Sequence, residues 1–289
     1  MALAGAGACE AGVTRFCDKP AEMSPQQQDT LLRMGALIKK ELDASGTSVA
    51  IVSRSGLDLS RFGVRYSHAG VSLKASGNTP WSVRQLYYAC DEKRPRVYDQ
   101  GIAGFLMGTD DPGLGFVSIV FLPQEAAAPL ERAALDDRLA LALLGGTYSA
   151  NAYPFSTRYQ NCNQWTAELL AAAWSEPALL PEDARAGAQS WLMAQHYAPT
   201  TFDVSRWLVL AGHFVPWVHH DDHPPQDVEQ ARFRISMPSS IESFVQSRLT
   251  EARRVEFCHA GRQMVIHRGW DPIGDGCVPG PEDTVLALD

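Results

Sequence analysis

The stretch RYQNCNQWTAELLAAAW, residues 158–174, joins an irregular polar segment to a strongly helical one. Its apolar residues recur at helical spacing, its alanines favour a helix, and Pro177 ends the run. Cys162 stands at the predicted helix N-terminus. Free backbone N–H groups and the positive end of the helix dipole favour a thiolate there, and can lower a cysteine pKa from about 8.5 to roughly 3.5–7.5. The sequence therefore predicts a reactive thiol at Cys162.

The composition is that of an ordinary folded protein. The chain has 289 residues, 45% of them hydrophobic and 20% charged, which is enough for a full core. The net charge of −8 disfavours a polyanion, so we expect no nucleic-acid partner. No apolar run approaches the about 18–20 residues of a membrane span, so we expect a protein that does not cross a membrane.

Six cysteines, at positions 9, 17, 90, 162, 258 and 277, are unevenly placed. Cys9 and Cys17 enclose a short segment near the N-terminus, and Cys258 and Cys277 enclose a short strand and a Gly/Pro-rich tail. We expect each pair to form a disulfide, worth roughly 2–3 kcal/mol. Such bonds imply an oxidising compartment.

The N-terminus also bears on localisation. Met1 precedes ALAGAGAC, small residues like those around a signal-peptidase site, without a charged or long apolar region before them. We expect that a signal peptide has been removed, that Met1 is an addition, and that the protein is periplasmic or secreted. The alternative is a cytosolic protein with free thiols.

The pattern predicts an N-terminal segment, residues 1–23, and a single α+β domain, residues 24–289, with a C-terminal extension, residues 177–289. A helix begins at Ser24 and Pro25, with an apolar stripe from Leu31 to Leu42. Four segments rich in β-forming residues predict strands at residues 49–53, 62–73, 81–89 and 115–122. Residues 91–111 are predicted to be a long loop that covers a cleft.

The second half is predicted to be mainly helical. Residues 126–144 form an alanine-rich helix, and residues 190–197 and 203–214 form two shorter helices. A strand at residues 232–237 and a helix at residues 238–253 follow. The chain is then predicted to end in a hairpin, residues 254–259 and 263–267, that turns at Gly261.

Cys162 and His68 are the first candidate pair. A nucleophilic thiol needs a base close in space and a third polar group that orients the base. His68 lies in a predicted strand, and Gln85 stands roughly opposite it across the predicted hairpin, with Arg84 on the other face. The alternative is that His68 is an ordinary strand histidine and Cys162 a buried structural thiol. From spacing alone, the catalytic and the structural interpretation of Cys162 and His68 have about equal support.

A family resemblance bears on this choice. SHAGV at residues 67–71, followed much later by NCNQW at residues 161–165, resembles the circularly permuted papain-like group, which includes NlpC-type peptidases and lecithin–retinol acyltransferase-like enzymes. The chain looks most similar, over most of its length, to a bacterial family of unknown function of the DUF2145 type. The resemblance implies an antiparallel sheet packed against the cysteine-bearing helix, with Cys162 as nucleophile and His68 as base. Gln85 departs from the His or acidic residue that the group often uses there.

The resemblance and the residues agree on acyl transfer. We expect a thiol hydrolase or acyltransferase of the cell envelope that acts through a thioester on a peptide, peptidoglycan or lipid-type substrate, without a cofactor. The Cys162 backbone N–H and one of Asn161, Tyr159 or Tyr153 would stabilise the oxyanion. The alternative is a non-catalytic periplasmic binding or interaction protein that retains the fold.

Two other clusters carry side chains of chemical interest. HHDDH at residues 219–223 is rich in zinc-type ligands but lacks their usual spacing, so we favour a solvated loop and predict no metal site. Asp99, Asp110 and Asp111 could pair for glycosidase chemistry, but adjacent aspartates in a loop more often form turns.

Overall fold

A computed structural model describes residues 22–288. The predicted N-terminal disulfide between Cys9 and Cys17 lies outside the described residues. The described residues form one large sheet with helices packed on it, and an α+β architecture is thus confirmed. Within residues 22–288, no helix combines the length and the apolarity that a membrane crossing needs.

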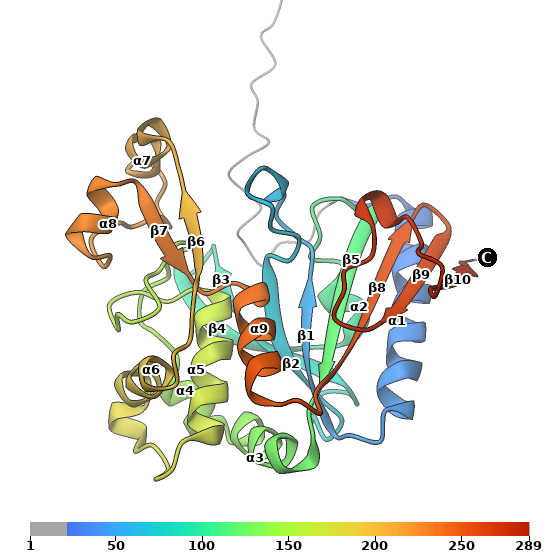
Figure 1. Cartoon of the computed structure of the whole chain (residues 1–289), viewed down its shortest axis with the longest axis horizontal. Coiled ribbons are helices and arrows are strands. Elements are labelled where there is room, and N and C mark those ends of the chain that lie inside the picture. Colours follow the sequence, from blue (N-terminus) through green and yellow to red (C-terminus); the bar gives the residue numbers. More distant parts are fainter. Residues whose placement is uncertain (1–21, 289) are drawn as a thin grey trace, which may run out of the picture.

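An eight-stranded antiparallel sheet, in the order β10-β9-β8-β5-β1-β2-β3-β4, forms the centre of the fold (Figure 1). Its strands are β1 Val49–Arg54, β2 His68–Leu73, β3 Ser82–Ala89, β4 Arg94–Gln100, β5 Leu114–Phe121, β8 Arg253–Ala260, β9 Gln263–Arg268 and β10 Thr284–Ala287. A separate antiparallel pair consists of β6 Thr200–Asp203 and β7 Arg232–Ile235. In Figure 1 this pair projects from the upper left of the molecule.

Helices cover both faces of the sheet. The helices of the described chain are α1 Pro25–Ala44, α2 Ile102–Leu106, α3 Gln124–Leu135, α4 Asp137–Ala142, α5 Cys162–Trp174, α6 Ala184–Ala194, α7 Arg206–Gly212, α8 Pro225–Glu229 and α9 Pro238–Arg248, with short 3₁₀ turns at Ser60–Phe62, Pro181–Asp183 and Asp275–Cys277. Of these, α7 and α8 lie beside the β6–β7 pair and not on the large sheet (Figure 1). Alternate residues of β1 pack to opposite sides: Val49 and Ile51 join α3 and α5, whereas Ala50 and Val52 join α1 and α2. The centre of the sheet is therefore buried on both faces.

Helix α5 is buried nearly all round, and it is anchored through a polar network as well as by its apolar residues. Glu168, inside this helix, pairs with Arg185 at 3.0 Å and accepts hydrogen bonds from Gln160 and Gln189 at 2.5 and 2.7 Å. Burial raises the pKa of Glu168, while Arg185 opposes that change. These partners hold α5 against α6 and the loop that precedes it.

Several predicted boundaries were wrong. The predicted loop at residues 91–111 contains β4 and α2, and β4 escaped notice because it is an edge strand with a charged, partly exposed sequence. The predicted helix at residues 126–144 is two helices, since Asp136 leaves the helical conformation and caps α4 by accepting from the N–H groups of Arg138 and Leu139. The hairpin of β8 and β9 does not end the sheet, because β10 adds to its edge.

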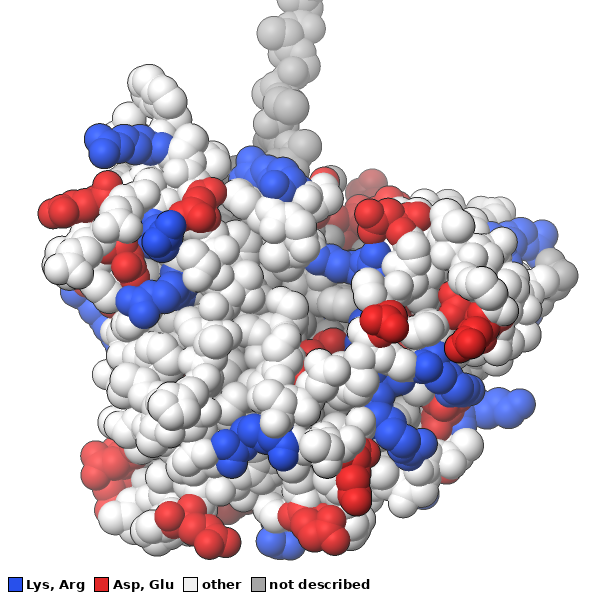
Figure 2. Space-filling model, viewed as in Figure 1, with Lys and Arg blue, Asp and Glu red and all other residues white. Residues whose placement is uncertain are grey.

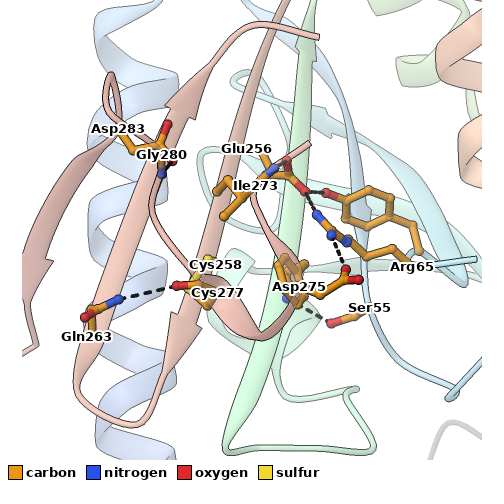
Figure 3. Close-up of a disulfide and its surroundings, with 12 residues drawn as sticks. Ser55, Arg65, Glu256, Cys258, Gln263, Ile273, Asp275, Cys277, Gly280 and Asp283 are labelled. Carbon is orange, nitrogen blue, oxygen red and sulfur yellow. Dashed lines mark hydrogen bonds and ion pairs between the residues drawn. A yellow bond between two sulfur atoms is a disulfide. The ribbon is translucent and has the colours of Figure 1, made fainter. Parts of the chain in front are cut away.

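The predicted disulfide between Cys258 and Cys277 is confirmed, with 5.7 Å between the Cα atoms. It ties β8 to the segment that follows β9 (Figure 3). Arg65 fastens the same segment by pairing with Glu256 at 2.9 Å and Asp275 at 2.7 Å. The C-terminal strands β8, β9 and β10 are thus part of the main sheet.

Charged side chains are mixed on the surface seen in Figure 2, where acidic and basic groups are interspersed. Exposed charges of the described chain also form ion pairs, such as Arg158 with Asp221 at 2.7 Å and Arg232 with Asp203 at 2.9 Å. The face seen in Figure 2 therefore carries no large patch that is only acidic or only basic.

Candidate functional site

The site forms where β2 and β3 separate. The two strands pair only at residues 71–73 of β2, and beyond that point the N-terminus of α5 takes the place of β3. The Asn163 carboxamide accepts from the Ala69 N–H at 2.9 Å and donates to the Ser67 carbonyl at 3.0 Å. Asn163 thereby satisfies the backbone on both sides of His68, as a neighbouring strand would. The cysteine helix is fixed directly beside the histidine strand.

His68 is oriented by Gln85. The imidazole Nε2 lies 2.7 Å from the Gln85 Oε1, and the Gln85 Nε2 donates to the Gln100 Oε1 at 2.8 Å. Because the carboxamide oxygen can only accept, Nε2 carries the proton, and Nδ1 is the nitrogen that can act as a base. The ring also stacks on Tyr87, with 4.5 Å between centroids.

Gly70 makes the contact between His68 and Gln85 possible. A Cβ on Gly70 would lie 2.8 Å from the Arg84 carbonyl oxygen and 3.1 Å from the Gln85 Cβ. Only a residue without a side chain leaves room for Gln85 to extend diagonally towards His68. As predicted, Arg84 is directed elsewhere, since it pairs with Asp99 at 2.6 Å.

Cys162 is a free thiol at the first position of α5, with 8% of its surface exposed. Burial raises the pKa of the thiol to about 11, although the backbone N–H groups of Asn163 and Cys162, the Arg54 charge and the Tyr148 hydroxyl act in the opposite direction. The low pKa expected from the helix N-terminus is thus not found. Desolvation of the charged form outweighs the helix-terminus effect.

His68 is neutral as well. Burial, with a further contribution from the Arg54 charge, lowers its pKa to about 3, and the hydrogen bond to Gln85 opposes the change. Cys162 and His68 are not hydrogen-bonded to each other. The resting site therefore holds a neutral thiol and a neutral imidazole in place of an ion pair.

A cavity of about 600 Å³ brings these groups to one space. Cys162, His68, Tyr148, Arg54 and Gln100 line its polar end. The rest of its wall is largely apolar and comes from several separate segments, with side chains that include Leu57, Phe62, Met107, Val209, Phe233 and Met237. This combination of an apolar wall and a few convergent polar groups is typical of a small-molecule site.

The three predicted oxyanion donors have different positions. Asn161 lines the cavity, but its side chain caps α5 by accepting from the Gln164 N–H at 2.7 Å, and it donates to the Ala150 carbonyl at 3.3 Å. Tyr159 is not among the lining residues and stacks on His219, with 4.3 Å between centroids. Tyr153 is also absent from the lining and packs under Arg234.

Residues 41–245 match the model of a protein family described as "uncharacterized protein conserved in bacteria (DUF2145)". The match covers more than half of the chain. The chain belongs to the DUF2145 family. His68, Gln85 and Cys162 lie inside the matched region, whereas the Cys258–Cys277 disulfide lies beyond it. No curated protein matches this DUF2145 chain, and no solved structure does.

Sequence reasoning missed four polar residues of this DUF2145 site, namely Arg54, Gln100, Tyr148 and Asn163. Asn163 offered a signal, because it stands beside Cys162 in the NCNQW motif. The others come from a strand end, an edge strand and an irregular segment, and nothing in the local pattern links them to Cys162. Only the meeting of these segments around the cavity identifies them.

The other two clusters have structural partners. His223 Nε2 lies 2.7 Å from the Asn151 carbonyl, and Asp222 accepts from the Tyr153 N–H at 2.8 Å. In the part of this DUF2145 protein that the structure describes, no group of three or more His, Cys, Asp or Glu side chains could hold a metal ion. Asp99 pairs with Arg84, and Asp111 caps a turn by accepting from the Gly113 N–H at 2.8 Å.

Proposed function

We propose that this protein catalyses thiol-dependent acyl transfer, as a hydrolase or an acyltransferase, with Cys162 as nucleophile, His68 as base and Gln85 as the group that orients the base. The observation that carries the proposal is that a free thiol at a helix N-terminus and an imidazole oriented by a carboxamide line the same cavity. The permuted papain-like relationship belongs to the same proposal. It is supported by the order of a histidine strand before a cysteine helix and by the contact of α5 with β2 and β3.

The reaction would proceed in two steps. The thiol proton passes to His68 Nδ1, directly or through one water, while the Cys162 sulfur bonds to the substrate carbonyl carbon. The tetrahedral intermediate then expels an amine or alcohol, which takes the proton from His68 and leaves a thioester. In the second step water or an acceptor bonds to the thioester carbonyl carbon and gives its proton to His68. The C–S bond then breaks, the acyl product leaves, and His68 returns the proton to the Cys162 sulfur.

Stabilisation of the oxyanion would come from the start of α5. The Cys162 backbone N–H lies at the helix N-terminus, where orphan donors face outward. The Tyr148 hydroxyl, which already interacts with the thiol, is a second donor at the cavity wall. We therefore propose Tyr148 in the role that the sequence suggested for Asn161, Tyr159 or Tyr153.

A second function is favoured by a specific observation. Because both groups are neutral and the thiol is only 8% exposed, the site also suits a binding protein that encloses a small apolar ligand without reacting with it. In that case Cys162 is a wall residue, and its replacement by alanine should leave ligand binding intact.

We further propose that the protein works in the cell envelope, on a peptide, peptidoglycan or lipid-type substrate. The support is the disulfide between Cys258 and Cys277, since such bonds persist in oxidising compartments. The largely apolar cavity wall supports a substrate with an apolar portion.

An activated ester tests the chemistry. The protein is mixed with p-nitrophenyl acetate, nitrophenolate release is followed by absorbance, and acetylation of Cys162 is followed by mass spectrometry. We expect transient acetyl-Cys162 and continued turnover. Cys162→Ala should abolish both, and His68→Ala should slow them by roughly 10²–10⁴-fold.

The matched control is His259→Ala. His259 is another fully buried strand histidine, but it does not line the cavity. Its loss should leave turnover in place if the folded protein is recovered. The proposal fails if Cys162→Ala hydrolyses the ester as fast as the wild type, or if wild type and His68→Ala acetylate Cys162 at equal rates.

A further inference from the structure

Arg54 is a buried cation at the edge of the site. It is the last residue of β1, it stands directly opposite His68 in the register of β1 and β2, and only 3% of its surface is exposed. Its guanidinium lines the cavity and lies over the Phe105 ring, 5.3 Å from the centroid. A buried arginine ordinarily has a carboxylate partner.

The partners of Arg54 are neutral. Its Nη1 donates to the Ser55 carbonyl at 3.2 Å and its Nη2 to the Tyr87 hydroxyl, while its Nε is buried without a hydrogen-bond partner. Within residues 22–288 no carboxylate forms an ion pair with it. An arginine has five N–H donors, so the guanidinium keeps both its full charge and unused donors.

The cavity does not supply the missing anion. Among the described residues that line the cavity, Asp99 is the one acidic residue, and Arg84 already binds it through two hydrogen bonds of 2.7 and 2.6 Å. Arg54 and the exposed Arg61 are the cations among the described lining residues. Within residues 22–288, no carboxylate of the cavity wall is therefore left to neutralise Arg54.

Two glycines hold the guanidinium in place. A Cβ on Gly56 would lie 2.4 Å from Arg54 Nη1, and a Cβ on Gly108 would lie 2.3 Å from Nη2. Any larger residue at either position would displace the charged head from its niche. The niche thus depends on backbone approach from two separate loops.

We propose that Arg54 binds a carboxylate of the substrate beside the reacting thiol. This inference rests on the proposed function and names its substrate class: an acyl compound with an anionic group close to the scissile carbonyl and an apolar portion along the remaining wall. A carboxylate would complete the ion pair that the folded chain leaves open. The same charge adds to the larger effect of burial in lowering the pKa of His68.

Two alkylating reagents that differ mainly in charge provide the test. Iodoacetate and iodoacetamide both form an S–CH₂ bond with Cys162 and release iodide, and the thiol proton goes to His68 or solvent. Rates at Cys162 are measured by mass spectrometry at one pH for each reagent. The iodoacetate rate is divided by the iodoacetamide rate, and this ratio is divided by the same ratio for 2-mercaptoethanol, a neutral thiol. The division corrects for the different intrinsic reactivities of the two reagents.

We expect the normalised ratio to favour iodoacetate by about tenfold or more in the wild type. Arg54→Gln should abolish this preference and Arg54→Lys should retain part of it. Arg61→Gln is the matched control, because Arg61 lines the same cavity but is exposed. It should keep the preference, which separates a specific contact from general attraction of anions.

The outcomes also separate this inference from the proposed function. If Cys162 reacts with both reagents in a His68-dependent manner but without preference for iodoacetate in the wild type, the carboxylate site is wrong and the thiol chemistry stands. If the preference exists but survives Arg54→Gln, another group recognises the anion and the assignment to Arg54 is overturned. The wild-type ratio decides the first point even if Arg54→Gln fails to fold.

Discussion

The Nε2 of His68 lies 2.7 Å from the carboxamide oxygen of Gln85, across the gap where β2 and β3 separate. The amide of Gln85 is held in turn by Gln100, so the oxygen faces the ring. This relationship fixes the tautomer of a buried neutral imidazole without bringing a second charge into the site. It provides a direct way to change the protonation of His68.

Gln85→Glu should raise the pKa of His68 from about 3, because a carboxylate beside Nε2 stabilises the imidazolium. Titration of the His68 ring by NMR measures the change. Gln100→Glu is the matched control. Gln100 contacts Gln85 and not the ring, so its new charge lies farther from His68 and should raise the pKa of His68 less. Equal titration of Gln85→Glu and wild type would show that the contact is not maintained in solution.

The stability of the protein should fall as the medium becomes acidic. The pKa of His68 is lowered in the folded state from 6.5 to about 3, so between these pH values the unfolded chain binds the extra proton. His68 therefore does not lower the free energy of unfolding above pH 6.5. From pH 6.5 towards pH 3 it lowers this free energy by about 1.4 kcal/mol per pH unit. Urea unfolding across this range measures it, and His68→Gln should show a shallower dependence.

Gly70→Ala should destabilise the protein by about 1–3 kcal/mol, because the added methyl group meets backbone that cannot easily move. The Gln85 side chain should also shift away from His68. Gly77→Ala is the matched control, since a Cβ there meets no atom within 4 Å. Thermal or urea unfolding compares the two, and equal stability of both variants would contradict the predicted crowding.

Asn163→Ala should cost about 1–3 kcal/mol, since it leaves the Ala69 N–H and the Ser67 carbonyl without partners. It should also loosen the N-terminus of α5 and speed the alkylation of Cys162. Asn78→Ala, which removes a hydrogen bond to the Asp99 carbonyl at an exposed turn, should cost less and leave Cys162 unchanged. Unchanged protection of the Ala69 amide in Asn163→Ala, measured by hydrogen exchange, would argue against this role.

Local patterns were enough to locate much of the fold. The cap at Ser24, the β-forming residues of β1, β3 and β5, and the helical run of α5 are each encoded within a few residues, and the structure has these elements near the predicted positions. The edge strands β4 and β10 were missed, because an edge strand faces solvent and lacks a continuous apolar pattern. The break at Asp136 was missed since a capping aspartate also fits within a helical sequence.

By itself, the sequence determined which residues are chemically capable: a cysteine at a helix start, a histidine in a strand, and Gln85 rather than Arg84 as the neighbour on its face. Only the tertiary structure decided their state. Burial is a property of the whole fold, and it reversed the pKa shift that the helix terminus alone predicts for Cys162. The cavity, lined by Arg54, Tyr148 and Gln100 among others, forms where the N-terminus of α5 meets β2 beyond the point at which β2 and β3 stop pairing, and no local pattern records that meeting.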